Sequence, residues 1–263
     1  MKKLILIGMA LAFAGFEAQA KERDAAEILA KSQAAFFYAG TDMKTRVTMG
    51  LIAPGGAKRT RVLTMLRKND GRNQKYFMYF HEPGDVRGTA FLVWKYPEKD
   101  DDRWIFVPAV NMVRRIAARD SRSSFVGSDF GYEDVSGRDL SADTHSFLRE
   151  EKLNDADCYV VQSIPKASAD FTKKVSWIDQ KTFLPLKEEY YDAQGELARV
   201  FTADRIENIG GGKIATVVRR TMKNVKSSHA TEVSFTDVAY GVGLDEGVFT
   251  EQSLQAPPQK WIQ

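Results

Sequence analysis

The acidic side chains whose spacing could support chemistry lie in one short stretch, residues 124–135, which reads SFVGSDFGYEDV. If residues 128–135 form a helical turn, two of the carboxylates of Asp129, Glu133 and Asp134 can share one face. Paired carboxylates can serve as a general acid and a general base. They can also form salt bridges that pin a loop to a neighbouring strand, and this is the interpretation that we favour.

Arginines precede this stretch and could neutralise its acids; they are Arg114, Arg115, Arg119 and Arg122. The first two belong to a short predicted strand, residues 112–116. We therefore predict that Arg114 and Arg115 anchor the loop through Asp129 or Asp134. An envelope hydrolase that uses Asp129, Glu133 or Asp134 remains the alternative if the carboxylates act in catalysis.

Other catalytic and metal-binding patterns are missing from the sequence. His81, His145 and His229 lie far apart, without neighbouring ligands at the spacing of a metal site. No Gly-x-Ser-x-Gly nucleophile motif occurs. The glycine run at residues 210–212 precedes a predicted strand, whereas phosphate-binding loops precede a helix. We predict no catalytic residue, no metal and no cofactor.

Aromatic side chains are concentrated between residues 77 and 132. Broad apolar rings suit a cavity for acyl chains better than they suit a polar reaction centre. We predict that the following residues lie near such a cavity: Phe80, Phe91, Trp94, Phe106, Phe125, Phe130 and Tyr132. A plain packed core would use the same side chains, and alternation along a strand does not decide which of them face inward.

A mainly β structure with one N-terminal helix must position these residues. Residues 24–38 space apolar side chains among polar ones, as an amphipathic helix does, and Gly40 ends the pattern. From residue 43 the alternation has period two, and residues 54–56 predict the turn of a hairpin. Strand-like runs then recur at residues 75–81, 89–96, 103–107, 112–116, 144–150, 158–164, 173–179, 186–192, 198–206, 214–222 and 231–238.

One long antiparallel sheet built from sequential hairpins is the economical topology for these strands. Residues 76–80 and 90–94 are apolar on both alternating faces, so both faces of the sheet need cover there. We expect the irregular or partly helical residues 117–140 to form a lid over one face. Since no linker or change in composition divides the chain, residues 21–263 are predicted to form a single domain.

The first twenty residues have the organisation of a secretory signal peptide. Lys2 and Lys3 precede an apolar run that is shorter than the roughly 20 residues of a spanning helix, and Ala18-Gln19-Ala20 supplies a cleavage site. Cleavage near Ala20 lowers the formal charge by one from +3, and such a nearly balanced charge does not indicate nucleic-acid binding. The single cysteine, Cys158, is predicted to be a small apolar side chain of a strand.

Three collinear segments, residues 80–90, 104–116 and 124–134, resemble the outer-membrane lipoprotein-sorting protein family, relatives of the periplasmic carrier LolA. They read FHEPGDVRGTA, WIFVPAVNMVRRI and SFVGSDFGYED. The likeness continues through Trp177-Ile178-Asp179 to Phe249-Thr250, and so covers nearly the whole chain after the signal peptide.

This resemblance implies a curved antiparallel sheet that forms an incomplete β-barrel, with helices over its open side and an apolar cavity between them. It also implies a non-enzymatic periplasmic carrier, whose lipid or acylated lipoprotein cargo passes between an inner-membrane exporter, often of the resistance-nodulation-division type, and an outer-membrane acceptor. Contact with the membranes would be transient. An accessory subunit that docks on an envelope transporter without cargo is the alternative.

Overall fold

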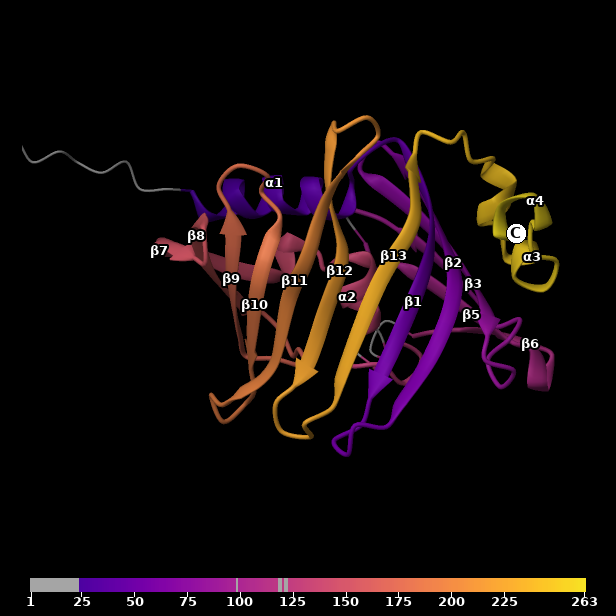
Figure 1. Ribbon diagram of the computed structural model, residues 1–263, viewed down its shortest axis with the longest axis horizontal. Coiled ribbons are helices and arrows are strands. Elements are labelled where there is room, and N and C mark those ends of the chain that lie inside the picture. The colour runs from indigo at the N-terminus through magenta and orange to yellow at the C-terminus, as the bar shows by residue number, and fades with distance from the viewer. Residues whose placement is uncertain (1–23, 98, 118–119, 121–122) are drawn as a thin grey trace, which may run out of the picture.

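The computed structural model describes residues 24–97, 99–117, 120 and 123–263. Its main feature is a thirteen-stranded antiparallel sheet (Figure 1). The strands are β1 (Asp42–Ile52), β2 (Lys58–Asp70), β3 (Asn73–Glu82), β4 (Ala90–Lys95), β5 (Asp102–Val107), β6 (Met112–Arg115), β7 (Asp143–Leu153), β8 (Ala156–Pro165), β9 (Lys173–Asp179), β10 (Pro185–Tyr191), β11 (Leu197–Ile209), β12 (Ile214–Asn224) and β13 (Ala230–Tyr240).

Helical elements are few and mostly short in the described chain. The α-helices are α1 (Ala25–Phe37), α2 (Tyr132–Ser136), α3 (Glu251–Gln255) and α4 (Gln259–Ile262). Short 3-10 turns occur at η1 (Pro108–Val110), η3 (Phe125–Gly127), η4 (Leu140–Ala142) and η5 (Glu246–Phe249). The predicted fold class, a mainly β incomplete barrel, is thus confirmed.

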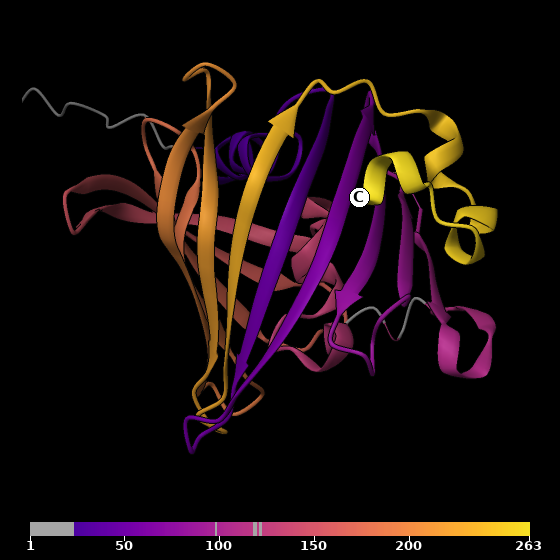
Figure 2. The ribbon, with the colours of Figure 1, turned by 45° about the vertical axis from the view of Figure 1, so that its right-hand side comes forward.

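The sheet consists of two meanders joined at one seam. Its order is β6-β5-β4-β3-β2-β1-β13-β12-β11-β10-β9-β8-β7, so every pairing joins strands adjacent in sequence except that of β1 with β13. Strands β6 and β7 are the two edges of the sheet and do not pair with each other. The sheet is therefore strongly curved but open, as Figure 2 shows.

This topology explains why residues between β6 and β7 cover the concave face. The chain leaves one edge at β6 and must reach the opposite edge at β7, and the described residues 123–142 pack across the inside of the curve. We call residues 123–142 the crossing segment. A bridge between Ser124 and Gly131 closes the loop at its start, and Phe125 N–H donates to the carbonyl of Phe130 at 2.7 Å.

Each face of the first meander carries its own hydrophobic cluster. On the concave side Val47, Met78 and Phe80 pack against Phe125 and Phe130 of the crossing segment. On the convex side the cluster comprises Leu66, Phe77, Ala90, Leu92 and Trp104 with Leu244, Val248, Phe249, Leu254 and Ile262 of the C-terminal segment. The prediction that both faces need cover is confirmed, and the convex cover is the C-terminal segment seen beside β2–β5 in Figure 2.

Helix α1 lies inside the curve, close to β7, β8 and β12 (Figures 1 and 2). Its N-cap is Asp24, whose Oδ1 accepts hydrogen bonds from the N–H groups of Ala26 and Glu27. Ile28 and Leu29 bury the apolar face of α1 against Val161 and Ile178. The predicted helix at residues 24–38 and the predicted strands agree with the structure to within a few residues, and the predicted signal peptide, residues 1–20, lies outside the described residues.

Candidate functional site

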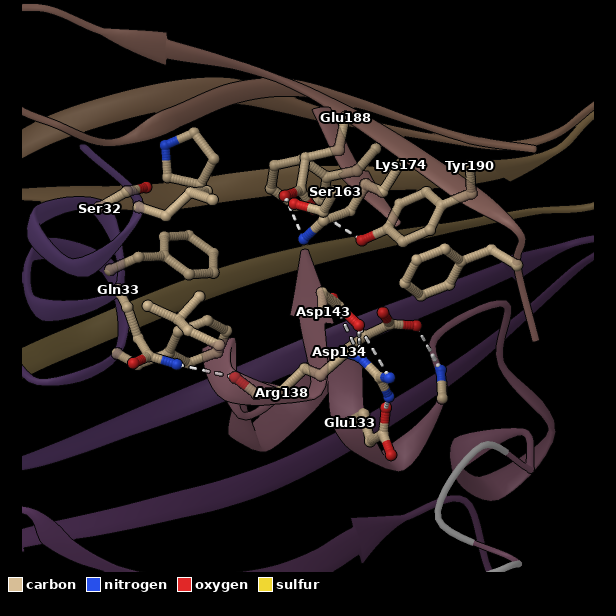
Figure 3. A pocket seen from close by; sticks show the side chains of 18 of the residues that line it. Ser32, Gln33, Glu133, Asp134, Arg138, Asp143, Ser163, Lys174, Glu188 and Tyr190 are labelled. Atoms are coloured by element: carbon tan, nitrogen blue, oxygen red, sulfur yellow. Dashed lines mark hydrogen bonds and ion pairs between the residues drawn. The ribbon is translucent and has the colours of Figure 1, made fainter. Parts of the chain in front are cut away.

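The first hollow lies between α1, the crossing segment and strands β7–β12. It comprises about 940 Å³ of space free of protein atoms, part of which is open to solvent. Figure 3 shows that polar groups from α1, the crossing segment and the sheet all point toward it. Its apolar lining comprises Leu29, Phe36, Phe37, Phe130, Leu140, Phe171, Pro185, Tyr190, Phe201 and Met222.

Two smaller hollows continue from the first along the concave face. The second, of about 550 Å³, shares Phe36 and Phe37 with the first, and the third, of about 300 Å³, shares Phe130 with it. The second and third share Met65, Val135, Arg220 and Phe235. Side chains of α1 and of the crossing segment thus form one wall of a row of adjacent spaces, and the sheet forms the other.

Ion pairs join the polar side chains at the rim of the first hollow. Arg138 of the crossing segment binds Glu133 at 2.7 Å and Asp143 at 3.0 Å. On the sheet, Lys174 pairs with Glu188 at 3.0 Å, and the Tyr190 hydroxyl donates to the same carboxylate at 2.6 Å (Figure 3). Because burial and the negative charge of Glu188 both disfavour a phenolate, the pKa of Tyr190 is raised well above its usual value.

Arg199 of β11 fastens the crossing segment to the second meander. Its two terminal nitrogens bind Asp134 at 2.7 Å and Asp170 at 2.6 Å. Burial alone would lower the pKa of Arg199, but the two carboxylates outweigh it and raise the pKa. Asp134 also accepts the Gly131 N–H at 2.7 Å, so one carboxylate caps α2 and holds the sheet. This arrangement supports fastening as the role of the acids.

Asp129 forms a further link between the crossing segment and the sheet. Its Oδ2 lies 2.6 Å from His229 Nδ1 and accepts a hydrogen bond from the Thr231 hydroxyl at 2.7 Å. A nucleophilic triad needs the hydroxyl on the second ring nitrogen of the histidine. Here the hydroxyl binds the carboxylate instead, so Asp129, His229 and Thr231 have the geometry of a fastener.

Five of the seven aromatic residues predicted to lie near a cavity are on the concave side. Phe80, Phe91, Phe125, Phe130 and Tyr132 belong to the concave cluster and are buried. Of these, Phe130 lines the first and third hollows and Phe125 lines the third. Phe80, Phe91 and Tyr132 pack behind Phe125, with ring centroids 6.2, 5.4 and 5.5 Å from it, and support the wall from the side away from the hollow.

The prediction for Trp94 and Phe106 was wrong. Both side chains pack in the convex cluster, under the C-terminal segment. The Trp94 indole N–H donates to the carbonyl of Phe249 at 2.8 Å, and its ring meets Trp104 edge to face. Because β4 and β5 are buried on both faces, aromatic content alone could not assign these residues to one side.

The prediction that Arg114 and Arg115 anchor the loop was also wrong. Both are exposed on the edge strand β6, and Arg115 pairs with Asp102 of the neighbouring strand β5. Asp129 and Asp134 are instead held by His229 and Arg199, from the second meander. The crossing segment leaves β6 and passes toward the far side of the sheet, and its acids therefore meet side chains of the second meander. Arg119 and Arg122 lie outside the described residues.

Sequence reasoning missed the hollow's second wall. The first hollow is lined by Phe36 and Phe37 of α1, by Phe171, and by Phe201 of β11. The apolar face of the helix was the available signal for the first two. Nothing local distinguishes Phe171 or Phe201, because their place at the hollow depends on the pairing of the whole second meander.

Other chemistry receives no support from the described residues. Within them no group of three His, Cys, Asp or Glu side chains is placed to hold a metal ion. Cys158 is fully buried, and burial raises the pKa of its thiol to about 11, so the reactive thiolate is scarce at neutral pH. No helix among residues 24–97, 99–117, 120 and 123–263 is long and apolar enough to cross a membrane.

An open, curved antiparallel sheet whose concave face holds a helix, a crossing segment and a lined hollow defines a carrier-type half-barrel. A family model described as "Uncharacterized protein" matches residues 72–256. A DUF1329 family protein from Desulfovibrio piger is 28% identical, with a TM-score of 0.81 over 88% of this chain and 98% of the other. A search of curated proteins found no match.

Two further crystal structures show which family this is. A domain assigned as an outer membrane lipoprotein-sorting protein, from Vibrio parahaemolyticus, is 30% identical, with a TM-score of 0.81 over 88% of this chain and 98% of that one. A LolA superfamily protein from Nitrosomonas europaea, 24% identical, has the same fold, with a TM-score of 0.69 over 88% and 99%. The chain belongs to the outer membrane lipoprotein-sorting protein family.

Proposed function

We propose that this protein is a non-enzymatic periplasmic carrier that binds the acyl chain of a lipid or lipoprotein in the row of hollows and moves it between the inner and outer membranes. The observation that carries the proposal is the continuous aromatic and methionine lining between α1, the crossing segment and the concave face. Ligand pockets usually combine predominantly apolar walls with a few polar groups. The second and third hollows have walls of this kind, and the first combines aromatic side chains with a charged rim.

The energetics of acyl transfer fit such a container. Each CH₂ group moved out of water gains roughly 0.8 kcal/mol, so a soluble carrier must offer an apolar space that competes with a bilayer. Release then requires a cover that can open. The crossing segment is our candidate for that cover, with Gly127 at φ +74° and Gly131 on either side of Phe130. Phe125 and Phe130 would contact the cargo directly.

The cellular context follows from the same proposal. Export with cleavage near Ala20 would place the protein in the periplasm, where lipid or acylated lipoprotein would be its cargo. An inner-membrane exporter of the resistance-nodulation-division type would supply this cargo and an outer-membrane acceptor would receive it. Contact with either membrane would be transient, and neither a nucleic acid nor a cofactor takes part.

A second candidate is an accessory subunit that docks on an envelope transporter and holds no cargo. The observation that favours it is at the β6 edge, where Val110 is 62% exposed and Met112 is 52% exposed. Unpaired edge strands with exposed apolar side chains are common docking surfaces. The two candidates differ in whether function requires an open hollow.

The proposal is tested by filling the hollow. Gln33 of α1 lines it, and the neighbouring Ala34 is exposed on the other side of the helix. Protein purified from periplasm is examined by native mass spectrometry and lipid extraction, and then by uptake of a fluorescent fatty acid. We expect bound lipid and uptake in the wild type and in Ala34→Trp, and at least a tenfold loss of uptake in Gln33→Trp.

A protein that is reproducibly empty and takes up no fatty acid would contradict the carrier proposal. Capture of envelope partners then separates the two candidates. A docking subunit keeps its partner when Gln33→Trp fills the hollow, whereas Met112→Asp at the β6 edge releases it. A carrier loses transfer of lipid between vesicles in Gln33→Trp and keeps it in Met112→Asp.

A further inference from the structure

Arg220 of β12 is a buried cation at the centre of the row of hollows. Its exposed fraction is 8%, and it lines both the second and the third hollow. Among the described residues around the third hollow, it is the one charged side chain; the others include Met49, Met78 and Val233. A guanidinium is therefore placed where the surroundings are otherwise suited to an acyl chain.

The structure gives this guanidinium no acidic partner. Arg138 and Arg199 each bind two carboxylates, but no ion pair or hydrogen bond joins the Arg220 guanidinium to any residue that the structure describes, and its Nε is buried without an acceptor. The carboxylate that acts electrostatically on Arg220 is that of Asp134, which already binds Arg199 and accepts the Gly131 N–H. Five N–H donors of a guanidinium normally find acceptors when buried.

Aromatic rings hold the cation in place without satisfying its hydrogen bonds. The guanidinium carbon lies 4.8 Å from the ring centroid of Phe235 and 5.4 Å from those of Phe36 and Phe130. These rings come from β13, α1 and the crossing segment, so all three layers around the hollow meet at this group. Cation–π contacts offset part of the cost of burial but leave the donors free for an incoming anion.

A second donor is available beside Arg220. The hydroxyl of Tyr76, from β3, is buried, has no hydrogen-bond partner in the described structure, and lines the second hollow with Arg220. Burial lowers the pKa of Arg220 to about 10, which still leaves it protonated at neutral pH. The second hollow also holds Arg67, whose Nε is buried without an acceptor but whose Nη2 donates to the carbonyl of Ala39. Arg220 and Tyr76 thus present unfilled donors to the same hollow, and an anionic oxygen group would satisfy both.

We propose that Arg220 and Tyr76 bind the anionic headgroup of an amphiphile, a carboxylate or a phosphate monoester, whose chain lies against the methionines and phenylalanines of the concave face. This inference rests on the proposed carrier function and names the chemical class of its cargo. The headgroup would enter first and lie deepest, between β12 and β3, with the hydrocarbon along the hollows. The charged rim around Arg138 and Lys174 needs no ligand, because its groups already pair with one another.

The experiment compares three ligands that share one chain and differ in the head. Dodecanoate, dodecyl phosphate and dodecanol displace the neutral dye Nile red from the full-length mature protein. We expect the wild type to bind one or both anions at least about tenfold more tightly than dodecanol, as a charge-assisted hydrogen bond predicts. The tighter of the two anions identifies the headgroup.

Variants of Arg220 and Tyr76 test whether these two side chains cause the preference for anions over dodecanol. Arg220→Met should bring the affinity for the anions down to that for dodecanol, with the affinity for dodecanol changed less than twofold. Tyr76→Phe should reduce anion affinity by a smaller factor. Arg219→Met is the matched control, because the Arg219 side chain is 53% exposed on the adjacent residue of β12, and it should keep the wild-type preference. Melting curves confirm that each variant is folded.

The outcomes separate this inference from the carrier function. Equal affinity for all three ligands in the wild type, or an anion preference that survives in Arg220→Met, would overturn the headgroup site and leave the carrier function standing. Failure of Nile red and of every ligand to bind would overturn the carrier function itself. If Arg220→Met does not fold, Tyr76→Phe and Arg220→Lys decide: the first should weaken the preference and the second should retain it.

Discussion

The carboxylates of residues 124–135 show how much of a side chain's role can be predicted from residue types alone. Their role as fasteners could be predicted from the absence of a nucleophile and a metal set in the sequence. Their partners could not, because His229 lies 100 residues from Asp129 and Arg199 lies 65 residues from Asp134. Only the strand order of the whole sheet brings these pairs together. The nearby Arg114 and Arg115 were better candidates by distance along the chain and were wrong.

Asp129→Asn should loosen the crossing segment from β13. The substitution removes the negative charge from an oxygen that accepts hydrogen bonds from His229 and Thr231, and the Asp129 side chain is only 7% exposed. We expect the free energy of unfolding to fall by about 1–3 kcal/mol. This corresponds to a fall of about 2–4 °C in Tm for each kcal/mol.

Thermal unfolding followed by circular dichroism measures the effect. Asp100→Asn is the matched control, since Asp100 is exposed, and it should change Tm by less than a degree. An unchanged Tm in Asp129→Asn would show that the link to His229 and Thr231 does not hold the crossing segment.

His81 should make stability depend on pH. Its Nε2 lies 2.9 Å from the buried Thr64 hydroxyl, and burial together with the nearby Arg46 lowers the pKa of His81 below 6.5 in the folded state. As pH falls through 6.5 the unfolded chain therefore binds the proton first, and stability is lost until the folded-state pKa is passed. In His81→Gln this loss is absent.

Urea unfolding at pH 8 and pH 5 tests the linkage. The free energy of unfolding of the wild type, relative to His81→Gln, should be smaller at pH 5 than at pH 8. A difference that stays constant over this range would mean that the folded and unfolded states titrate alike at His81.

At the scale of elements, the strands and the first helix followed from local patterns, and the lid followed in part. Alternation and turn residues fixed the strands to within a few residues, and the two-sided apolar strands correctly required cover on both faces. Of the predicted lid, residues 117–140, the described residues 123–140 were correctly expected over one face. The sequence did not reveal α3 and α4, which are five and four residues long, too short for a helical period to show.

The junction between α1 and β1 depends on Gly40. Gly40 has φ +71°, and a Cβ there would lie 2.7 Å from Cδ1 of the Tyr240 ring. Gly56, in the β1–β2 turn, has a similar φ of +82° with open space around it. Gly56→Ala should therefore show only the cost of a left-handed alanine, about 1–2 kcal/mol, and Gly40→Ala should show that cost plus the clash.

The midpoint of urea unfolding compares the two glycine variants directly. The midpoint should fall further in Gly40→Ala than in Gly56→Ala. Equal midpoints would mean that Tyr240 moves aside freely and that α1 is not held tightly at its C-terminal end.

At the scale of the whole molecule, the two hydrophobic clusters on opposite faces of the first meander have different roles. The convex cluster under the C-terminal segment contains Trp94 and Phe106 and only stabilises the fold, whereas the concave side holds the hollows. The sequence could not separate these roles, because strands buried on both faces are apolar at every position.

Phe249→Ala should separate stability from binding. Phe249 is 1% exposed in the convex cluster, and its truncation should cost about 3–5 kcal/mol. Since the residue lies on the other side of the sheet from the hollows, the affinity for Nile red should stay within twofold of the wild type while the protein remains folded.

Val225→Ala provides the comparison, because Val225 is 39% exposed and its truncation should stay within about 0.5 kcal/mol. Denaturant unfolding and dye titration are measured on the same samples. Weakened dye binding by Phe249→Ala under folding conditions would show that the two faces are coupled.

The seam between β1 and β13 also sets the order in which the chain can fold. Each meander is built from local hairpins, but the seam pairs Met43 with Tyr240, so most of the sequence separates the two partners. Contacts of such high sequence separation are slow to form. Until residue 240 is available, β1 presents an unpaired edge, which is a site for aggregation. If the whole chain stays unfolded until β13 is available, β1 can pair with β13 as it folds and its edge is not left exposed.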